Sequence, residues 1–120
     1  MFTIEYYEKE DGSLPAEDYI LSVKDKKLKA KIFHDLEILE LEGNQLRRPT
    51  SNHLEDGIFE LRTIQSNNIA RVLYFFYIDK KIILTNGFTK KTQKTPRKEI
   101  DLAKKYRDDY LTRFKEWFYE

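Results

Sequence analysis

The chain has 120 residues, a formal net charge of +1 and no cysteine. A globule of this length buries roughly two thirds of the surface its unfolded chain exposes, so we expect one domain over residues 1–120. Lack of cysteine excludes disulfides and thiolate metal sites, and two isolated histidines do not give zinc-ligand spacing. Without a signal-peptide pattern or a long apolar segment, we expect a cytoplasmic protein with no cofactor, metal or membrane contact.

The first half of the chain predicts a strand and two helices. Residues 1–7 alternate apolar and polar side chains, which is typical of a half-buried strand. Ser13, just ahead of Pro15, is the expected cap of a first helix, and Asp25 that of a second. Gly43 then predicts the end of the second helix. The apolar positions of the second helix recur at helical spacing: Leu28, Ile32, Leu36 and Leu39.

The second half predicts an antiparallel meander and a last helix. Residues 58–65 alternate, residues 69–78 are apolar on both faces like a central strand, and residues 82–88 form a third strand. Thr95 and Pro96 predict the start of the last helix. Its expected apolar stripe contains Ile100, Ala103, Tyr110, Phe114 and Trp117.

The order β-α-α-β-β-β-α predicts an α+β fold. We expect a twisted, mainly antiparallel sheet with a two-helix hairpin on one face and a C-terminal helix. The first strand is expected beside the meander, at either edge. Residues 45–57 are expected to form a loop, which carries Arg47, Arg48 and His53.

Positive charge is concentrated after the central strand. From Lys80 to Lys98 there are seven Lys or Arg and no Asp or Glu, although the whole chain is nearly neutral. We call residues 90–96 the tongue. If the sheet register brings Arg62 and Arg71 to one face, two guanidinium groups flank its lysines. Arginine offers a planar fork and lysine a mobile point charge, so this cluster predicts a surface for a phosphate polyanion.

Such a cluster suits metal-free cleavage of RNA. The 2′-hydroxyl of RNA can serve as nucleophile, and preorganised cations stabilise the charge that develops on phosphorus. His53 is a candidate for proton transfer because histidine exchanges protons near neutral pH. The candidate catalytic residues are Arg62, Arg71, Lys90, Lys91 and His53. The candidate RNA-phosphate contacts are Lys94, Arg47, Arg48, Arg97 and Lys98.

Each candidate also has a structural interpretation. A lysine run in a turn is usually a solvated face. Arg71 is as well suited to an ion pair with Glu60 across the sheet as to RNA contact. His53 in a loop is more often an exposed bystander than a catalyst.

Several motifs together resemble a known family. They are Glu60-Leu61-Arg62, Arg71, Gly87-Phe88, the run from Lys90 to Pro96, and Glu99-Ile100 with Ala103. This pattern resembles the phage-derived Gp49-like proteins, which are HigB-type toxins of the RelE/ParE superfamily. The resemblance extends over most of the chain, and the run Gly-Phe-x-Lys-Lys-x-x-Lys-Thr-Pro is its most specific part.

The resemblance implies a toxin of a type II toxin–antitoxin pair. Such a toxin cleaves mRNA on the translating 70S ribosome, is silenced by a helix-turn-helix antitoxin, and reaches operator DNA only through the antitoxin complex. Arg62, Arg71, Lys90, Lys91 and Lys94 fall where the superfamily places cationic RNA-facing residues. Many relatives carry His before the Gly-Phe pair, where this chain has Asn86, which cannot exchange a proton at neutral pH. A ParE-like toxin that binds DNA gyrase and a catalytically silent interaction protein stay open as alternatives.

Overall fold

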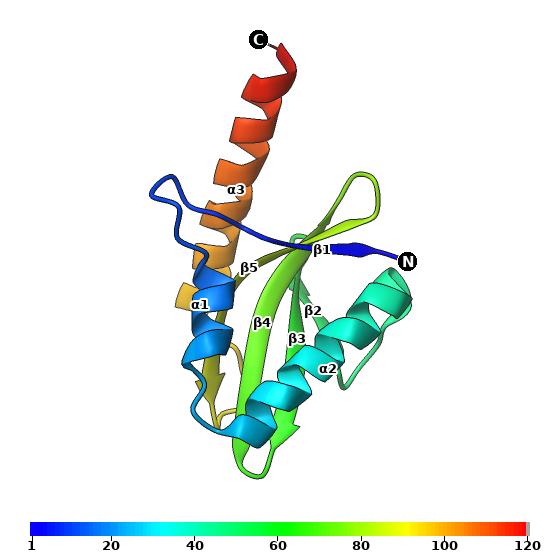
Figure 1. Cartoon of the computed structure of the whole chain (residues 1–120), viewed down its shortest axis with the longest axis vertical. Helices are drawn as coiled ribbons and strands as arrows, with labels where there is room; N and C mark the ends of the chain where they lie inside the picture. The colour runs from blue at the N-terminus through cyan, green and yellow to red at the C-terminus, as the bar shows by residue number, and fades with distance from the viewer. Residues whose placement is uncertain (120) are drawn as a thin grey trace.

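The computed structural model describes the backbone of residues 1–119 and the side chains of residues 1–113 (Figure 1). It contains five strands, three α-helices and one short 3-10 turn. In chain order these are β1 (Thr3–Tyr6), α1 (Pro15–Ser22), α2 (Lys26–Glu42), η1 (Gly43–Gln45), β2 (Ser51–Glu55), β3 (Ile58–Gln65), β4 (Asn68–Tyr77), β5 (Lys81–Lys90) and α3 (Arg97–Tyr119).

The strands form one sheet in the order β1-β5-β4-β3-β2. Each strand from β2 to β5 pairs antiparallel with the next one along the chain. Strand β1 instead pairs parallel to β5, with Ile4 opposite Ile82. The first strand therefore joins the β5 edge, which the sequence left open. The α+β prediction with a mainly antiparallel sheet is confirmed.

Helices cover both faces of this sheet. In Figure 1, α1 and α2 lie in front of the strands and α3 lies behind them. Most residues of β4 are buried, as expected for a central strand with both faces covered. The α2 side buries Leu28, Ile32, Leu36 and Leu39 against Leu61, Val72, Tyr74 and Leu84. The α3 side buries Ile58, Leu73, Phe75 and Ile83 with Ala103 and Tyr110.

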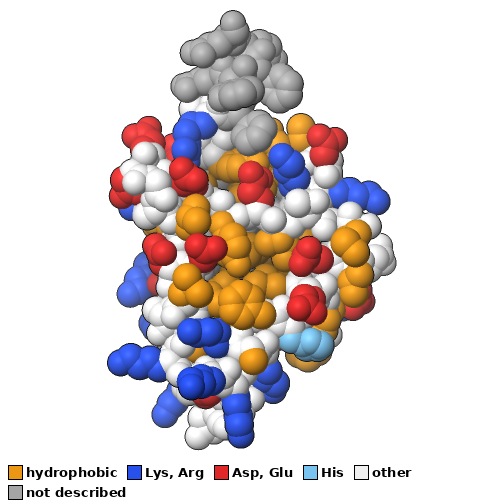
Figure 2. All heavy atoms as spheres, in the orientation of Figure 1, with side chains coloured by type: hydrophobic (Ala, Val, Ile, Leu, Met, Phe, Trp, Pro, Cys, Tyr) orange, Lys and Arg blue, Asp and Glu red, His pale blue; other side chains and the backbone are white. Residues whose placement is uncertain are grey.

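The α2 side also has an uneven surface. Figure 2 shows hydrophobic side chains gathered between α1 and α2, and Lys and Arg side chains toward the end of the molecule where α2 begins. None of the helices in the described part of the chain is long and apolar enough to cross a bilayer.

The expected ends of α2 are confirmed. The Asp25 carboxylate accepts hydrogen bonds from the backbone N–H groups of Lys27 (2.9 Å) and Leu28 (3.2 Å), which otherwise lack helical partners. Gly43 ends the helix with φ +52°. The Phe2 ring lies so close that a Cβ at residue 43 would overlap it, so a side chain is excluded there on steric as well as conformational grounds.

The expected caps of the other two helices are wrong. The Ser13 hydroxyl donates to Asp11 (2.7 Å), and α1 starts after Leu14 without a side-chain cap. Helix α3 starts at Arg97, and the hydroxyl of Thr95 donates to the buried carboxylate of Glu60. In both cases a nearby carboxylate takes the hydroxyl that would have capped the helix. Phe114 and Trp117 of the expected α3 stripe lie outside the described side chains.

The expected loop over residues 45–57 is also wrong, because it contains the last residue of η1 and all of strand β2. Strand β2 pairs antiparallel with β3, with Asn52 opposite Glu60. Its sequence, SNHLE, is short and polar and lacks an apolar alternation, so periodicity did not reveal it. The turn between β2 and β3 did carry a signal: Asp56 (φ +51°) and Gly57 (φ +78°) form the Asp-Gly pair typical of a two-residue hairpin.

Candidate functional site

The α3 side of the sheet changes from apolar to polar where β5 leads into the tongue. Arg62 lies directly opposite Arg71 in the β3–β4 pair, and Arg71 lies opposite Phe88 in the β4–β5 pair. Opposed residues project from the same face of a sheet. The condition set by the sequence, that the register bring the two arginines to one face, is met.

Arg71 is completely buried beneath the tongue. Its guanidinium donates to the carbonyl oxygens of Lys90 (3.5 Å) and Thr92, and it lies over the Phe88 ring, 5.4 Å from the centroid. Burial lowers the pKa of Arg71, and the nearby Glu60 carboxylate opposes this shift. A phosphate has no access to this guanidinium in the described conformation. Arg71 instead attaches the tongue backbone to the centre of the sheet.

Glu60 holds the counter-charge at the centre of a buried polar network. Its side chain is 2% exposed, and Oε1 lies 3.5 Å from Nε of Arg71 and accepts the hydrogen bond from Thr95. Its other oxygen accepts from Asn52 (3.2 Å) and lies 3.9 Å from Nε of Arg62. The alternative in which Arg71 pairs with Glu60 is thus confirmed. Glu60 connects β2, β3, β4 and the tongue.

The lysines of the tongue face solvent above this network. Lys90, Lys91 and Lys94 are all exposed, while the Arg62 side chain is 17% exposed and donates to Gln93 (2.8 Å). A hollow of about 510 Å³ opens beside the tongue, between β2 and the start of α3, and its lining includes Lys94. The result is a set of mobile ammonium groups on a backbone that buried side chains hold in place.

Arg97 and Lys98 lie in the first turn of α3, and Arg97 lines this hollow. Arg97 donates to both carboxylate oxygens of Glu55 (2.6 Å each) and also pairs with Asp101 (3.1 Å). The hydrogen bonds from Arg97, and then from Lys104, lower the pKa of Glu55 to about 2. Arg97 and Lys98 are both exposed, but Arg97 is paired with acids.

Asn86 is a structural residue in this fold. Its side chain is buried, donates to the backbone oxygen (3.2 Å) and Oε1 (3.1 Å) of Glu99, and accepts from the Thr85 hydroxyl (2.7 Å). These bonds fix the first turn of α3 to β5. The position before the Gly-Phe pair thus anchors the far end of the tongue.

The Gly-Phe pair itself has a packing explanation. A Cβ at residue 87 would collide with the Tyr19 ring and lie 2.9 Å from the carbonyl oxygen of Arg71. The absence of a side chain lets the Tyr19 ring of α1 pack against β5. Phe88 covers the Arg71 guanidinium on the opposite face.

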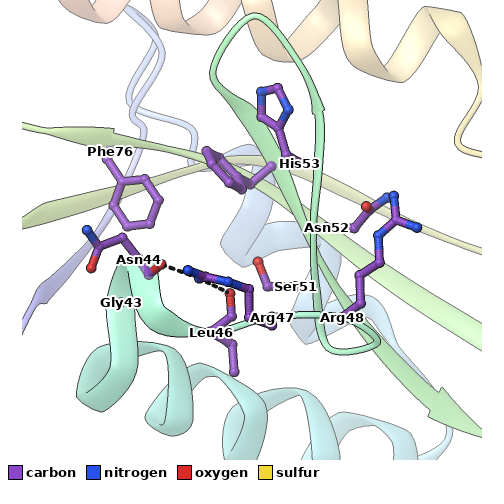
Figure 3. A pocket seen from close by; sticks show the side chains of 10 residues that line it. Gly43, Asn44, Leu46, Arg47, Arg48, Ser51, Asn52, His53 and Phe76 are labelled. Carbon is purple, nitrogen blue, oxygen red and sulfur yellow. Dashed lines mark hydrogen bonds between the residues drawn. The ribbon is translucent and has the colours of Figure 1, made fainter.

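Arg47, Arg48 and His53 lie elsewhere. They line a hollow of about 580 Å³ between the end of α2 and β2 (Figure 3), and no tongue residue is among its described lining. The His53 ring contacts Phe59 (centroids 4.9 Å apart), which belongs to the α2-side core. The structure therefore separates His53 from the tongue lysines, and its role in proton transfer stays a prediction.

Sequence reasoning missed the residues that organise the site. Glu60 was expected only as an alternative partner for Arg71, and Asn52, Gln93 and Thr95 were not expected to take part. The alternation of Glu60 and Arg62 on the polar face of one strand was the available signal. Among the described residues, no group of three or more His, Asp or Glu is placed to hold a metal ion.

The fold and the site together define a small α+β protein in which a cationic tongue is tied to a central strand by a buried arginine. Residues 19–108 match the phage-derived Gp49-like protein family (DUF891). Because the match runs from the second half of α1 to the middle of α3 and covers more than half of the chain, the protein belongs to this family. A comparison with curated proteins found no similar sequence.

Proposed function

We propose that this protein is the toxin of a type II toxin–antitoxin pair and that it cleaves mRNA on the translating ribosome. The observation that carries the proposal is the tongue, whose exposed lysines stand on a backbone held by Arg71 and Glu60. A solvated charge run needs no such support. A surface that must align a phosphate does need this support, because each contact stabilises the transition state more strongly when the site is already in place.

In this proposal the RNA supplies its own nucleophile. The 2′-hydroxyl loses its proton as its oxygen attacks the adjacent phosphorus. The bond to the 5′-oxygen of the next nucleotide breaks and that oxygen takes up a proton, so a 2′,3′-cyclic phosphate and a 5′-hydroxyl result. Lys90, Lys91 and Lys94 contact the phosphoryl oxygens, on which negative charge grows during the attack. Arg62, at the edge of the network, adds a guanidinium fork. This chemistry requires no metal ion.

Arg71 has a positioning role in this proposal. Its bonds to the carbonyl oxygens of Lys90 and Thr92 set the course of the tongue, and its charge is matched by Glu60. Arg71 occupies the position where the superfamily has a cationic residue in the central strand. In this chain we assign it the role of supporting the tongue. The lysines then make the RNA contacts.

The proposal includes the partners of such toxins. A helix-turn-helix antitoxin silences the toxin, the mRNA is presented by the 70S ribosome in the cytoplasm, and operator DNA is reached only through the toxin–antitoxin complex. The Gp49-like family match supports this reading through the resemblance of that family to HigB-type toxins.

The test is induction of the chain in bacteria without an antitoxin, followed by primer extension on cellular mRNA. We expect growth arrest and new 5′ ends at ribosome A-site codons. The variant Lys90→Ala/Lys91→Ala should restore growth, whereas the charge-matched control Lys80→Ala/Lys105→Ala should stay toxic. Growth arrest without mRNA cleavage would instead favour a gyrase-binding toxin. Absence of arrest would overturn both toxin proposals.

A further inference from the structure

The hollow beside Arg47, Arg48 and His53 has features of a binding site that the tongue does not account for. It lies on the α2 side of edge strand β2, next to the turn that ends α2 (Figure 3). Its volume of about 580 Å³ is within the range of small-molecule sites. Its lining combines aromatic rings with two arginines, whereas no aromatic ring is among the described lining of the hollow beside the tongue.

Phe59 and Phe76 form an aromatic wall of this hollow. Their ring centroids are 5.2 Å apart at an interplanar angle of 79°, and Phe59 also stacks on the buried Tyr74 ring at 5.5 Å. His53 adds a third ring, 4.9 Å from Phe59. Both phenylalanines are only half-buried, so part of the wall is open to a ligand. Rings held in this way are a surface on which any nucleobase can stack.

The two arginines are arranged differently from each other. Nη1 of Arg47 donates to the carbonyl oxygens of Asn44 (2.6 Å) and Leu46 (3.4 Å). These bonds fix the guanidinium across the hollow. Its positive charge also offsets the partial negative charge of these carbonyl groups just beyond the end of α2. Figure 3 shows Arg48 extending in another direction, alongside Asn52. A fixed guanidinium plane stacks on a base, while an extended one reaches a phosphate.

His53 offers a directed hydrogen-bond donor. Its Nε2 accepts the backbone N–H of Gly57 (3.2 Å), so in the neutral ring the proton is on Nδ1. Nδ1 can therefore donate to a ligand oxygen without a change in protonation.

We propose that this hollow binds one nucleotide of a single-stranded RNA. The base stacks between the Arg47 guanidinium and the Phe59–Phe76 wall, and Arg48 contacts its phosphate. The inference rests on the proposed function, which it deepens by adding a second RNA contact. Asn52 lines both this hollow and the one beside the tongue, so an RNA strand that crosses the edge of β2 reaches both.

The test is a titration of the ¹⁵N-labelled full chain with UMP, AMP, uridine and inorganic phosphate, observed by NMR. We expect saturable shifts of the Asn52, His53 and Gly57 amides with the nucleotides.

Three variants separate the contributions to binding. Arg48→Ala should weaken nucleotide binding about tenfold, because the phosphate then has no guanidinium partner. Arg47→Lys should weaken it by about fivefold or more, because lysine keeps the charge but not the stacking plane. Lys105→Ala, on an exposed part of α3, is the control and should have no effect.

Equal binding of UMP and inorganic phosphate would overturn the proposal, because the site would then recognise an anion alone. Absence of shifts around β2, or full binding by Arg47→Lys, would overturn it as well. Failure here is distinguishable from failure of the proposed function. If nucleotides do not bind but induced cells still show A-site cleavage, only this inference is lost. If nucleotides bind but mRNA stays intact, the nuclease proposal is lost.

Discussion

The Glu60 carboxylate lies 3.5 Å from Nε of Arg71, with 2% and 0% of the two side chains exposed. Removal of one partner from a buried pair leaves the other charge uncompensated. We therefore expect Glu60→Ala to lower the free energy of unfolding by about 3–5 kcal/mol in urea denaturation. The double variant Glu60→Leu/Arg71→Met should recover part of this loss, because no lone buried charge remains. A loss below about 1 kcal/mol for Glu60→Ala would mean that water reaches the pair.

The same pair controls the tongue. Arg71→Met keeps much of the buried volume but removes the donors to the carbonyl oxygens of Lys90 and Thr92. We expect trypsin to cleave this variant faster after Lys91 and Lys94, as measured by mass spectrometry of the first fragments. Cleavage after Lys80, in the turn at the opposite end of β5, is the internal control. An equal increase at both places would indicate general destabilisation and contradict a specific attachment of the tongue.

The tongue lysines should act on RNA affinity without affecting folding. Lys90, Lys91 and Lys94 are exposed, and substitutions at such positions usually change stability by less than about 0.5 kcal/mol. We expect Lys90→Ala/Lys91→Ala to weaken binding of a short single-stranded RNA. The slope of log K against log salt should also decrease by about 0.7 for each RNA phosphate that the variant no longer neutralises. Fluorescence anisotropy at several salt concentrations gives both quantities. An unchanged slope would show that these lysines do not bind phosphate.

Periodicity predicted the fold well where side chains alternate and poorly where polar contacts decide. The apolar repeat from Leu28 to Leu39 and the apolar run of β4 gave the helix and the central strand correctly. Strand β2 has no such pattern, because its buried Ser51 is stabilised by a hydrogen bond to Tyr74 (2.5 Å) rather than by apolar contacts. That partner lies 23 residues away and is not visible in the local sequence.

The sequence predicted which residues belong to the candidate site, but not how these residues are arranged in space. Charge clustering identified the tongue lysines, whereas the sheet register, which the sequence does not give, decided that Arg62 lies beside Arg71. Nothing local distinguishes a buried arginine from an exposed one, so the burial of Arg71 required the tongue to be seen folded over it. His53 was grouped with the lysines by residue type, but alternation along β2 turns its ring toward the α2-side core.

Gly87 should tolerate no side chain. A Cβ there would collide with the Tyr19 ring and approach the Arg71 carbonyl oxygen, so we expect Gly87→Ala to cost about 1–3 kcal/mol of unfolding free energy. The cost should be smaller when the substitution is made in a Tyr19→Ala background, where the ring is absent. Thermal or urea unfolding of the four members of this cycle gives the coupling. Equal costs in both backgrounds would show that the clash is with the β4 backbone, at the Arg71 carbonyl oxygen, and not with the Tyr19 ring.

Alkaline pH should destabilise the protein through buried tyrosines. Burial raises the pKa of Tyr74 to about 12, against an ordinary value of 10, and the Ser51 hydrogen bond only partly offsets this. The folded state thus disfavours the tyrosinate, so the contribution of Tyr74 to stability is complete below pH 10 and is lost as the pH rises toward about 12. Tyr74→Phe should make the unfolding free energy less steeply dependent on pH in this interval. Tyr7, whose pKa burial also raises to about 12, will maintain part of the dependence. An identical pH profile for Tyr74→Phe and the parent chain would show that the Tyr74 hydroxyl ionises as easily in the folded chain as in the unfolded one.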